Sequence, residues 1–195
     1  MKINHPLMHN NFAKSDMDAV RKLIKNKNLI LTQSKKVLEF EKKWSKWLGA
    51  KYSVFVNSGS SANLISMLIL KSLSSKKKEI IVPTLTWVSD INSVIMAGFK
   101  PIFVDIDPRT LSMNQEQVIK KINKNTLAVF VTHVQGFHSL SEKLLKIIKR
   151  KKILLVEDVC ESHGAKFNGK KLGTFGLISN FSFYYAHHMS TMKAE

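Results

Sequence analysis

Ile153-Leu-Leu-Val-Glu157 is a run of four apolar residues that ends in an acid, and it decides the fold. A strand this apolar is buried on both faces of its sheet, as strands are in parallel sheets covered by helices. Similar runs occur earlier, at residues 79–82, 101–105 and 127–132. Helical segments separate them, so the sequence predicts an α/β fold in which a mostly parallel sheet has helices on both faces and right-handed crossovers.

The part of the chain before these strands reads as an arm and two helices. Residues 1–14 show no clear periodicity and are expected to form an N-terminal arm, with one domain over residues 15–195. Ser15-Asp-Met-Asp18 offers N-cap chemistry for a helix that ends near residues 25–28. A second helix is predicted to end at Gly49, with a core-facing stripe made of Val37, Phe40, Trp44, Trp47 and Leu48.

Charge and cysteine content narrow the classes of partner. The formal net charge is +17, but only Arg21, Arg109 and Arg150 are arginines, and the lysines are spread along the chain. Arginine supplies the bidentate contacts of base and phosphate recognition, so we expect no nucleic-acid partner. The single cysteine, Cys160, rules out an internal disulfide and fits a reducing compartment. No run approaches the roughly 18 apolar residues of a membrane span, so we expect a cytoplasmic protein without a membrane partner.

A turn of small residues indicates an anion site. Residues 52–56 are rich in strand-forming side chains and are predicted to be the first strand, and Asn57-Ser-Gly-Ser-Ser-Ala62 follows, before a helical segment. Backbone N–H groups and the helix dipole converge at such a turn, and Ser58, Ser60 and Ser61 add hydroxyl groups. The alternative is a helix that is simply capped, and the turn alone leaves both open.

Other candidate residues also follow predicted strands. Ligands in such sheets bind beyond the carboxyl ends of the strands, where Trp87, His133, Asp158 and His187 are all expected. Together with the serine turn, they fit a phosphorylated, cationic, planar heterocycle. The pair His187-His188 could act as an acid or base, could bind a metal, or could be a hydrogen-bonded end of a core strand.

Five motifs, in order, resemble one enzyme family. They are Asn57-Ser-Gly-Ser-Ser-Ala62, Val82-Pro-Thr-Leu-Thr-Trp87, Val104-Asp-Ile-Asp-Pro108, Val156-Glu-Asp-Val-Cys-Glu-Ser-His-Gly-Ala165 and Phe181-Ser-Phe183. Together they look like the large-domain signature of the DegT/StrS-type nucleotide-sugar aminotransferases, which are fold type I pyridoxal-phosphate enzymes of polysaccharide biosynthesis. The resemblance covers residues 15–191 and implies a three-layer α/β/α large domain that binds the cofactor.

The resemblance implies a role for six residues in binding pyridoxal 5'-phosphate (PLP) or pyridoxamine 5'-phosphate (PMP). Ser60, Ser61 and Ser182 would hold the phosphate group. Trp87 would stack on the pyridine ring, and Asp158 would pair with the protonated ring nitrogen, which keeps the ring able to withdraw electrons. Glu161 would lie near the ring hydroxyl.

One position departs from the aminotransferase pattern. His187 stands where the family has the lysine that forms a Schiff base with the cofactor. This resembles the branch that removes the 3-hydroxyl group of 4-keto-6-deoxy nucleotide sugars, in which His187 would act as base and then as acid. His188 is the second candidate and is as readily structural. The alternatives are a transaminase of the same family and, from another class, an inactive fragment that binds anions or partners.

Two further expectations concern the extent of the chain. Met192-Lys-Ala-Glu195 does not match the acidic-Gly-Gly turn that follows in the family, so we expect a truncated chain without the small C-terminal domain. The resemblance also implies a homodimer. One dehydratase type in this branch carries an iron–sulfur cluster, for which Cys160 would need further cysteines beyond residue 195. We therefore expect no metal and a buried thiol at this position.

Overall fold

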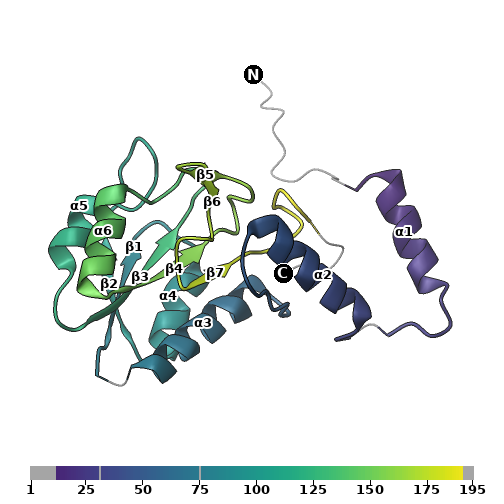
Figure 1. The fold of residues 1–195 in the computed structure, drawn as a ribbon, viewed down its shortest axis with the longest axis horizontal. Coiled ribbons are helices and arrows are strands. Elements are labelled where there is room, and N and C mark those ends of the chain that lie inside the picture. Colours follow the sequence, from purple (N-terminus) through teal and green to yellow (C-terminus); the bar gives the residue numbers. More distant parts are fainter. Residues whose placement is uncertain (1–11, 31, 75, 191–195) are drawn as a thin grey trace. The chain divides into compact units, whose positions relative to one another are not determined.

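The computed structural model describes residues 12–30, 32–74 and 76–190 (Figure 1). The chain divides into two compact units, Met1–Phe55 and Val56–Glu195. Residues 1–11 of the predicted arm lie outside the described residues.

The first unit contains two helices, α1 (Lys14–Ile24) and α2 (Lys35–Leu48). Helix α1 begins before the predicted cap: Ala13 takes the N-cap position, and its N–H donates to the Asp16 carboxylate at 2.8 Å. Helix α2 ends at Gly49, as predicted, with φ +89°. Of its two tryptophans, Trp44 is buried, whereas Trp47 lies against the Trp44 ring and is 38% exposed.

The predicted first strand, residues 52–56, is wrong, because no helix or strand includes these residues. A strand exists only when its backbone groups bond to a neighbouring strand. Here the Phe55 N–H donates to the Glu41 carboxylate at 2.8 Å, and the Phe55 carbonyl accepts from the Gln33 amide at 3.5 Å. Side chains of the first unit thus take the backbone bonds that a strand partner would make.

The second unit is built on a five-stranded parallel sheet with the order β2-β1-β3-β4-β7, which confirms the predicted α/β fold. The strands are β1 (Glu79–Pro83), β2 (Lys100–Val104), β3 (Thr126–Thr132), β4 (Leu154–Asp158) and β7 (Ile178–Asn180). The helices are α3 (Gly59–Leu73), α4 (Val88–Met96), α5 (Gln115–Lys121) and α6 (Glu142–Lys151).

Alternation along the strands creates two cores, one on each face of the sheet. Ile81, Val129 and Leu155 belong to the core that includes residues of α5 and α6. Their neighbours Ile80, Ala128 and Val156 belong to the core that includes residues of α3 and α4 (Figure 1). Because both faces are covered, β3 is buried at every position, which explains its continuous apolar sequence.

A short hairpin, β5 (Lys166–Phe167) and β6 (Lys170–Lys171), was not anticipated. Its turn residues, Asn168 and Gly169, both have positive φ, +47° and +77°. Asn-Gly is the preferred pair for a two-residue turn of this kind, so the signal is present in the sequence.

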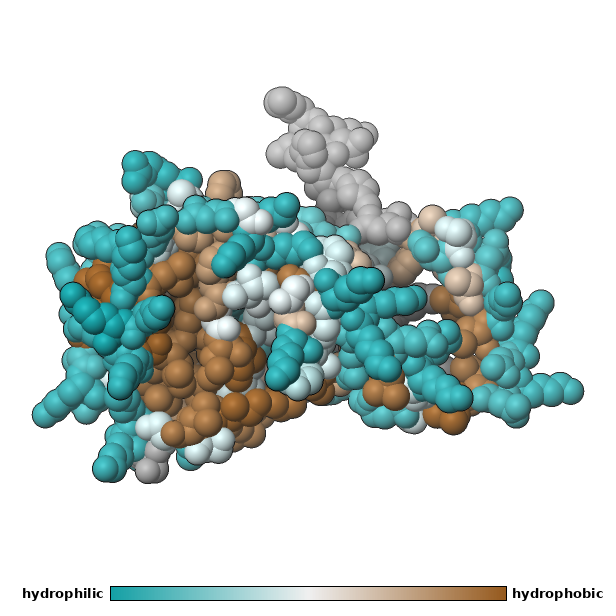
Figure 2. All heavy atoms as spheres, viewed as in Figure 1, coloured by the Kyte–Doolittle hydropathy of each residue, from teal (hydrophilic) through white to brown (hydrophobic). Residues whose placement is uncertain are grey.

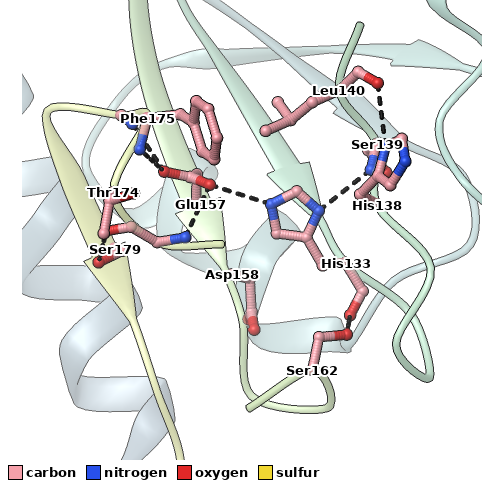
Figure 3. Close-up of polar contacts among 12 residues, drawn as sticks. His133, His138, Ser139, Leu140, Glu157, Asp158, Ser162, Thr174, Phe175 and Ser179 are labelled. Atoms are coloured by element: carbon pink, nitrogen blue, oxygen red, sulfur yellow. Dashed lines mark hydrogen bonds and ion pairs between the residues drawn. The ribbon is translucent and has the colours of Figure 1, made fainter. Parts of the chain in front are cut away.

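A buried carboxylate joins β3, β4 and the loop before β7 (Figure 3). Glu157 in β4 has no exposed surface and accepts a hydrogen bond at 3.1 Å from Nε2 of His133, which is equally buried. Its other donors are the backbone N–H groups of Gly173, Phe175 and Gly176, at 2.9, 2.9 and 2.6 Å. Burial raises the pKa of Glu157, but His133 and the N–H groups of Gly173 and Gly176 outweigh it and hold the pKa below its usual value.

His133 therefore has a structural role: its ring is fully buried and lies between Glu157 and the Ser139 N–H. The Ser139 N–H donates to its Nδ1 at 3.1 Å, which leaves the ring proton on Nε2, where it faces Glu157. The neutral ring thus accepts on one side and donates on the other.

Replacing Glu157 by glutamine should lower the free energy of unfolding by about 3 kcal/mol, because a buried charge-assisted network loses its acceptor. The amide NH₂ group would face donors that already point at the site. Urea unfolding monitored by circular dichroism measures the change. Glu142→Gln, at an exposed position, is the matched control and should leave stability unchanged. Equal stability of the two variants would contradict a central role for Glu157.

Candidate cofactor-binding site

The candidate residues gather at one edge of the second unit, where the parallel strands end. Thr86 and Trp87 follow β1, Thr132 ends β3, Asp158 ends β4, and Ser182 follows β7. Because the strands are parallel, their carboxyl ends share this edge, which is where open α/β sheets bind ligands.

The first turn of α3 lies against the segment after β7. Ser58 caps the helix, and its Oγ accepts from the Ser61 N–H at 3.0 Å, so the capping alternative is realised. A Cβ atom at Gly59 would lie 3.4 Å from the Ser182 Cβ and 3.8 Å from the Cys160 Sγ. The start of α3 and Ser182 are therefore packed together around a residue without a side chain, at the positive end of the helix, where an anion is favoured.

Asp158 is a buried carboxylate, only 4% exposed. Its Oδ1 accepts from the Cys160 N–H at 2.9 Å, and Asn63 Nδ2 approaches its Oδ2 at 3.5 Å. These are the nitrogen donors that reach it in the described part of the chain. A buried carboxylate with so few donors fits a ligand that brings its own positively charged N–H, as a protonated pyridine ring does.

A set of buried polar side chains behind Asp158 escaped the sequence analysis. The Asn180 amide donates to Asn63 Oδ1 at 2.7 Å, and the Ser66 hydroxyl donates to Asn180 Oδ1 at 3.0 Å. Asn63 in turn donates to Asp90 Oδ1 at 2.6 Å. The set joins α3, α4 and β7, and it fixes the amide that faces Asp158.

Three histidines form an aromatic cluster near Asp158. The His163 ring lies 6.2 Å from both the His187 and the His188 rings, measured between centroids. Burial lowers the pKa of His163 to about 4, with further lowering by its two histidine neighbours. Burial also lowers the pKa of His187, against the raising effect of Glu161 and Asp158. His163 and His187 are therefore neutral near pH 7, and His187 is able to accept a proton.

The remaining predicted residues are more open. Trp87 is 68% exposed at the start of α4, where its carbonyl accepts from the Asp90 N–H at 3.0 Å. Ser60, Glu161 and His188 are also exposed. The charge of Glu161 nevertheless acts on His187, so the two side chains share the site. Cys160 is mostly buried, and burial raises the pKa of its thiol well above the usual value.

Among residues 12–30, 32–74 and 76–190, no group of three or more histidine, cysteine, aspartate or glutamate side chains is placed to hold a metal ion. Within the same residues, no helix is both long and apolar enough to cross a membrane.

Comparison with known proteins gives relatives over nearly the whole chain. The model of the DegT/DnrJ/EryC1/StrS aminotransferase family matches residues 10–194. GDP-4-keto-6-deoxy-D-mannose 3-dehydratase of Yersinia pseudotuberculosis is 33% identical over 195 residues, covering 98% of this chain and 49% of the relative. GDP-perosamine synthase of Escherichia coli O157:H7 is 34% identical over 148 residues, covering 76% of this chain and 40% of the relative.

Solved structures agree in fold. The E. coli GDP-4-keto-6-deoxy-D-mannose 3-dehydratase with bound hydrated PLP has a TM-score of 0.92 at 34% identity, and the match covers 99% of this chain and 50% of that one. An aminotransferase of pseudoaminic acid biosynthesis from Helicobacter pylori has a TM-score of 0.86 at 27% identity, with 95% and 49% covered. The chain thus spans about half the length of the relatives it matches.

The lowered pKa of His163 predicts a pH dependence of stability. The unfolded chain takes up a proton near pH 6.5, whereas folded His163 resists it until about pH 4, so the free energy of unfolding falls as the pH drops through this window. Urea unfolding between pH 4 and 7 should show a flatter profile for His163→Asn than for the unmodified chain. His138→Asn, at an exposed histidine, should keep the original slope. An unchanged slope in His163→Asn would refute the assignment.

Proposed function

The chain belongs to the DegT/DnrJ/EryC1/StrS aminotransferase family, and from that premise we propose that it carries the cofactor-binding part of a PMP-dependent sugar 3-dehydratase. The proposed substrate is a GDP-linked 4-keto-6-deoxyhexose, as the names of the dehydratase relatives suggest. The observation that carries the proposal is His187, a neutral imidazole beside Asp158 and Glu161 at the position of the aminotransferase lysine.

The site offers a partner for each part of the cofactor. Asp158 would pair with the ring nitrogen, because it is buried and poor in donors. The phosphate group would lie at the start of α3, with Ser60, Ser61 and Ser182. Trp87 would cover the ring, and Glu161 would approach the ring hydroxyl. Bound PMP would supply an amine for the sugar ketone and a ring that withdraws electrons.

His187 would move protons during the reaction. A neutral imidazole can take a proton from carbon and return one to the leaving hydroxyl group, and its pKa, lowered by burial, keeps it neutral near pH 7. Histidine has no primary amine, so it would leave the cofactor free to exchange between its aldehyde and amine forms. His188, which is exposed, is the second candidate for proton transfer.

The proposal extends to a cytoplasmic homodimer. Helices α3 and α4 expose large apolar side chains, and Figure 2 shows apolar surface where these helices lie. An apolar face of this kind commonly marks an interface. The residues are Ile65, Leu68, Ile69, Leu73, Ile95 and Met96.

A sugar aminotransferase is the second candidate, because GDP-perosamine synthases are also among the relatives. It needs covalent attachment of the cofactor to a lysine, and position 187 is a histidine. Sodium borohydride, which fixes such a link permanently, separates the two activities.

The decisive experiment mixes the protein, at the full length that its gene encodes, with PMP and GDP-4-keto-6-deoxymannose and follows loss of the 3-hydroxyl group by mass spectrometry. His187→Asn should lower the rate about 100-fold or more, because it removes the proton-transfer group. Borohydride treatment with PLP should leave the unmodified chain without covalent cofactor, whereas His187→Lys should gain it and lose dehydration.

His138→Asn is the matched control, because His138 lies outside the site, and its activity should be unchanged. Full dehydration by His187→Lys, or a borohydride-fixed cofactor in the unmodified chain, would sink the dehydratase proposal. Absence of any PLP or PMP binding, together with salt-sensitive binding of polyanions, would instead support an anion-binding fragment.

A further inference from the structure

Asp90 has no role in the proposed reaction, although it lies within the same buried cluster as Asp158. It belongs to the first turn of α4 and is 1% exposed. Its Oδ1 accepts from Asn63 Nδ2 at 2.6 Å. The same nitrogen donates to Ser89 Oγ at 2.9 Å and lies 3.5 Å from Asp158 Oδ2. A second buried carboxyl group beside the first raises the question of how the pair is charged.

The number of hydrogens available to the contacts of Asp90 Oδ2 indicates the charge of Asp90. This oxygen is in hydrogen-bond contact with the Thr86 hydroxyl and lies 2.8 Å from the Thr132 hydroxyl, and the two hydroxyls lie 2.6 Å from each other. The three oxygens form a ring with three contacts. Each threonine provides one hydrogen, so two hydrogens serve three contacts if Asp90 is ionised. A proton on Asp90 supplies the third.

The surroundings favour the same state. Burial raises the pKa of Asp90 well above its usual range, and the charge of Asp158 and a side-chain hydrogen bond with it raise the pKa further. The hydrogen bonds from Thr86 and Thr132 lower it, but by less. No ion pair involves Asp90 among residues 12–30, 32–74 and 76–190, so no nearby cation compensates an ionised form there. Two other titratable groups interact with Asp90: the charge of Asp158 raises the pKa of Asp90, and the charge of Asp90 raises the pKa of the Cys160 thiol. Two adjacent buried carboxyl groups hold one negative charge more readily than two.

We propose that Asp90 is a neutral carboxylic acid that closes the ring with Thr86 and Thr132 and thereby leaves the adjacent Asp158 as the charged member of the pair. The part of this inference that concerns the cofactor rests on the proposed function. Asp90 is a positioning residue, because it would act on the pyridine ring only through Asp158.

Neutrality matters because of what Asp158 has to bind. If Asp90 were ionised, its charge would repel that of Asp158 and favour protonation of Asp158. A protonated Asp158 could not stabilise a pyridinium ion. With the proton held in the threonine ring, Asp158 keeps its charge. The Cys160 N–H, at 2.9 Å from Asp158 Oδ1, is the close donor that orients this carboxylate.

The first test needs no cofactor. Carbon-13 NMR of the chain labelled at the aspartate side-chain carboxyl should show one protonated carboxylic acid at pH 7. That signal should vanish in Asp90→Asn and persist in Asp158→Asn. Asp18→Asn, at an exposed carboxylate, is the matched control and should leave the signal unchanged. A signal that disappears with Asp158 instead, or no protonated acid at all, would overturn the inference.

The second test uses the cofactor. Asparagine can donate to both threonine hydroxyls and accept from Asn63, so Asp90→Asn should bind PMP within about threefold of the unmodified chain. Asp158→Asn should weaken binding by about 100-fold or more, since a buried charge partner is lost. Asp90→Ser replaces Asp90→Asn if the asparagine variant does not fold. Equal weakening by Asp90 and Asp158 substitutions would show that both are charged partners.

The two tests keep the hypotheses apart. If the unmodified chain binds no PMP, the proposed function fails, whereas the NMR signal still decides where the proton lies. If PMP binds but the protonated carboxyl is missing, the proposed function stands and the inference about Asp90 falls.

Discussion

The buried carboxylate of Glu157 is the interaction on which the candidate site depends. It accepts hydrogen bonds from His133 at the end of β3 and from three backbone groups of the loop before β7. A buried charge is stable only when hydrogen bonds satisfy it. The loop therefore has little freedom to move, because any movement would remove hydrogen bonds from Glu157 or expose it. The contact therefore fixes the position of β7 and, with it, the segment that carries Ser182 and His187.

Strand geometry gives the next residue the opposite role. Successive side chains in a strand point to opposite faces of the sheet. Glu157 therefore follows Leu155 on the face covered by α5 and α6, while Asp158 follows Val156 on the face covered by α3 and α4. One acid is saturated with donors and holds the fold together, and the other is left with few donors at an open edge. In the proposed function, adjacent acids of the same strand would thus serve two purposes: Glu157 stabilises the fold, and Asp158 would contact the cofactor.

Much of this arrangement could be predicted from the sequence. The apolar runs predicted β1, β2, β3 and β4, because burial in the sheet leaves a continuous apolar signal, whereas the short β7 (Ile178–Asn180) has no such run. The first predicted strand failed because a strand-like composition does not supply a partner strand. Asn63 and Asp90 were missed for another reason: their roles arise from contacts between side chains 27 and 95 residues apart, and no local pattern reports these. The hairpin at Asn168-Gly169 could have been predicted from its Asn-Gly turn pair, but it was not.

The burial of Cys160 bears on the chemical selectivity of the edge where it lies. Its sulfur packs beside the start of α3, within 3.9 Å of the Asn180 carbonyl. Thiolates add readily to aldehydes and are easily oxidised, whereas a thiol kept protonated by its raised pKa does neither efficiently. The Cys160 side chain can thus pack near Gly59 without acting as a nucleophile towards a bound aldehyde. An aldehyde-bearing molecule bound nearby would meet an inert sulfur, and an oxidising environment would find little thiolate to attack.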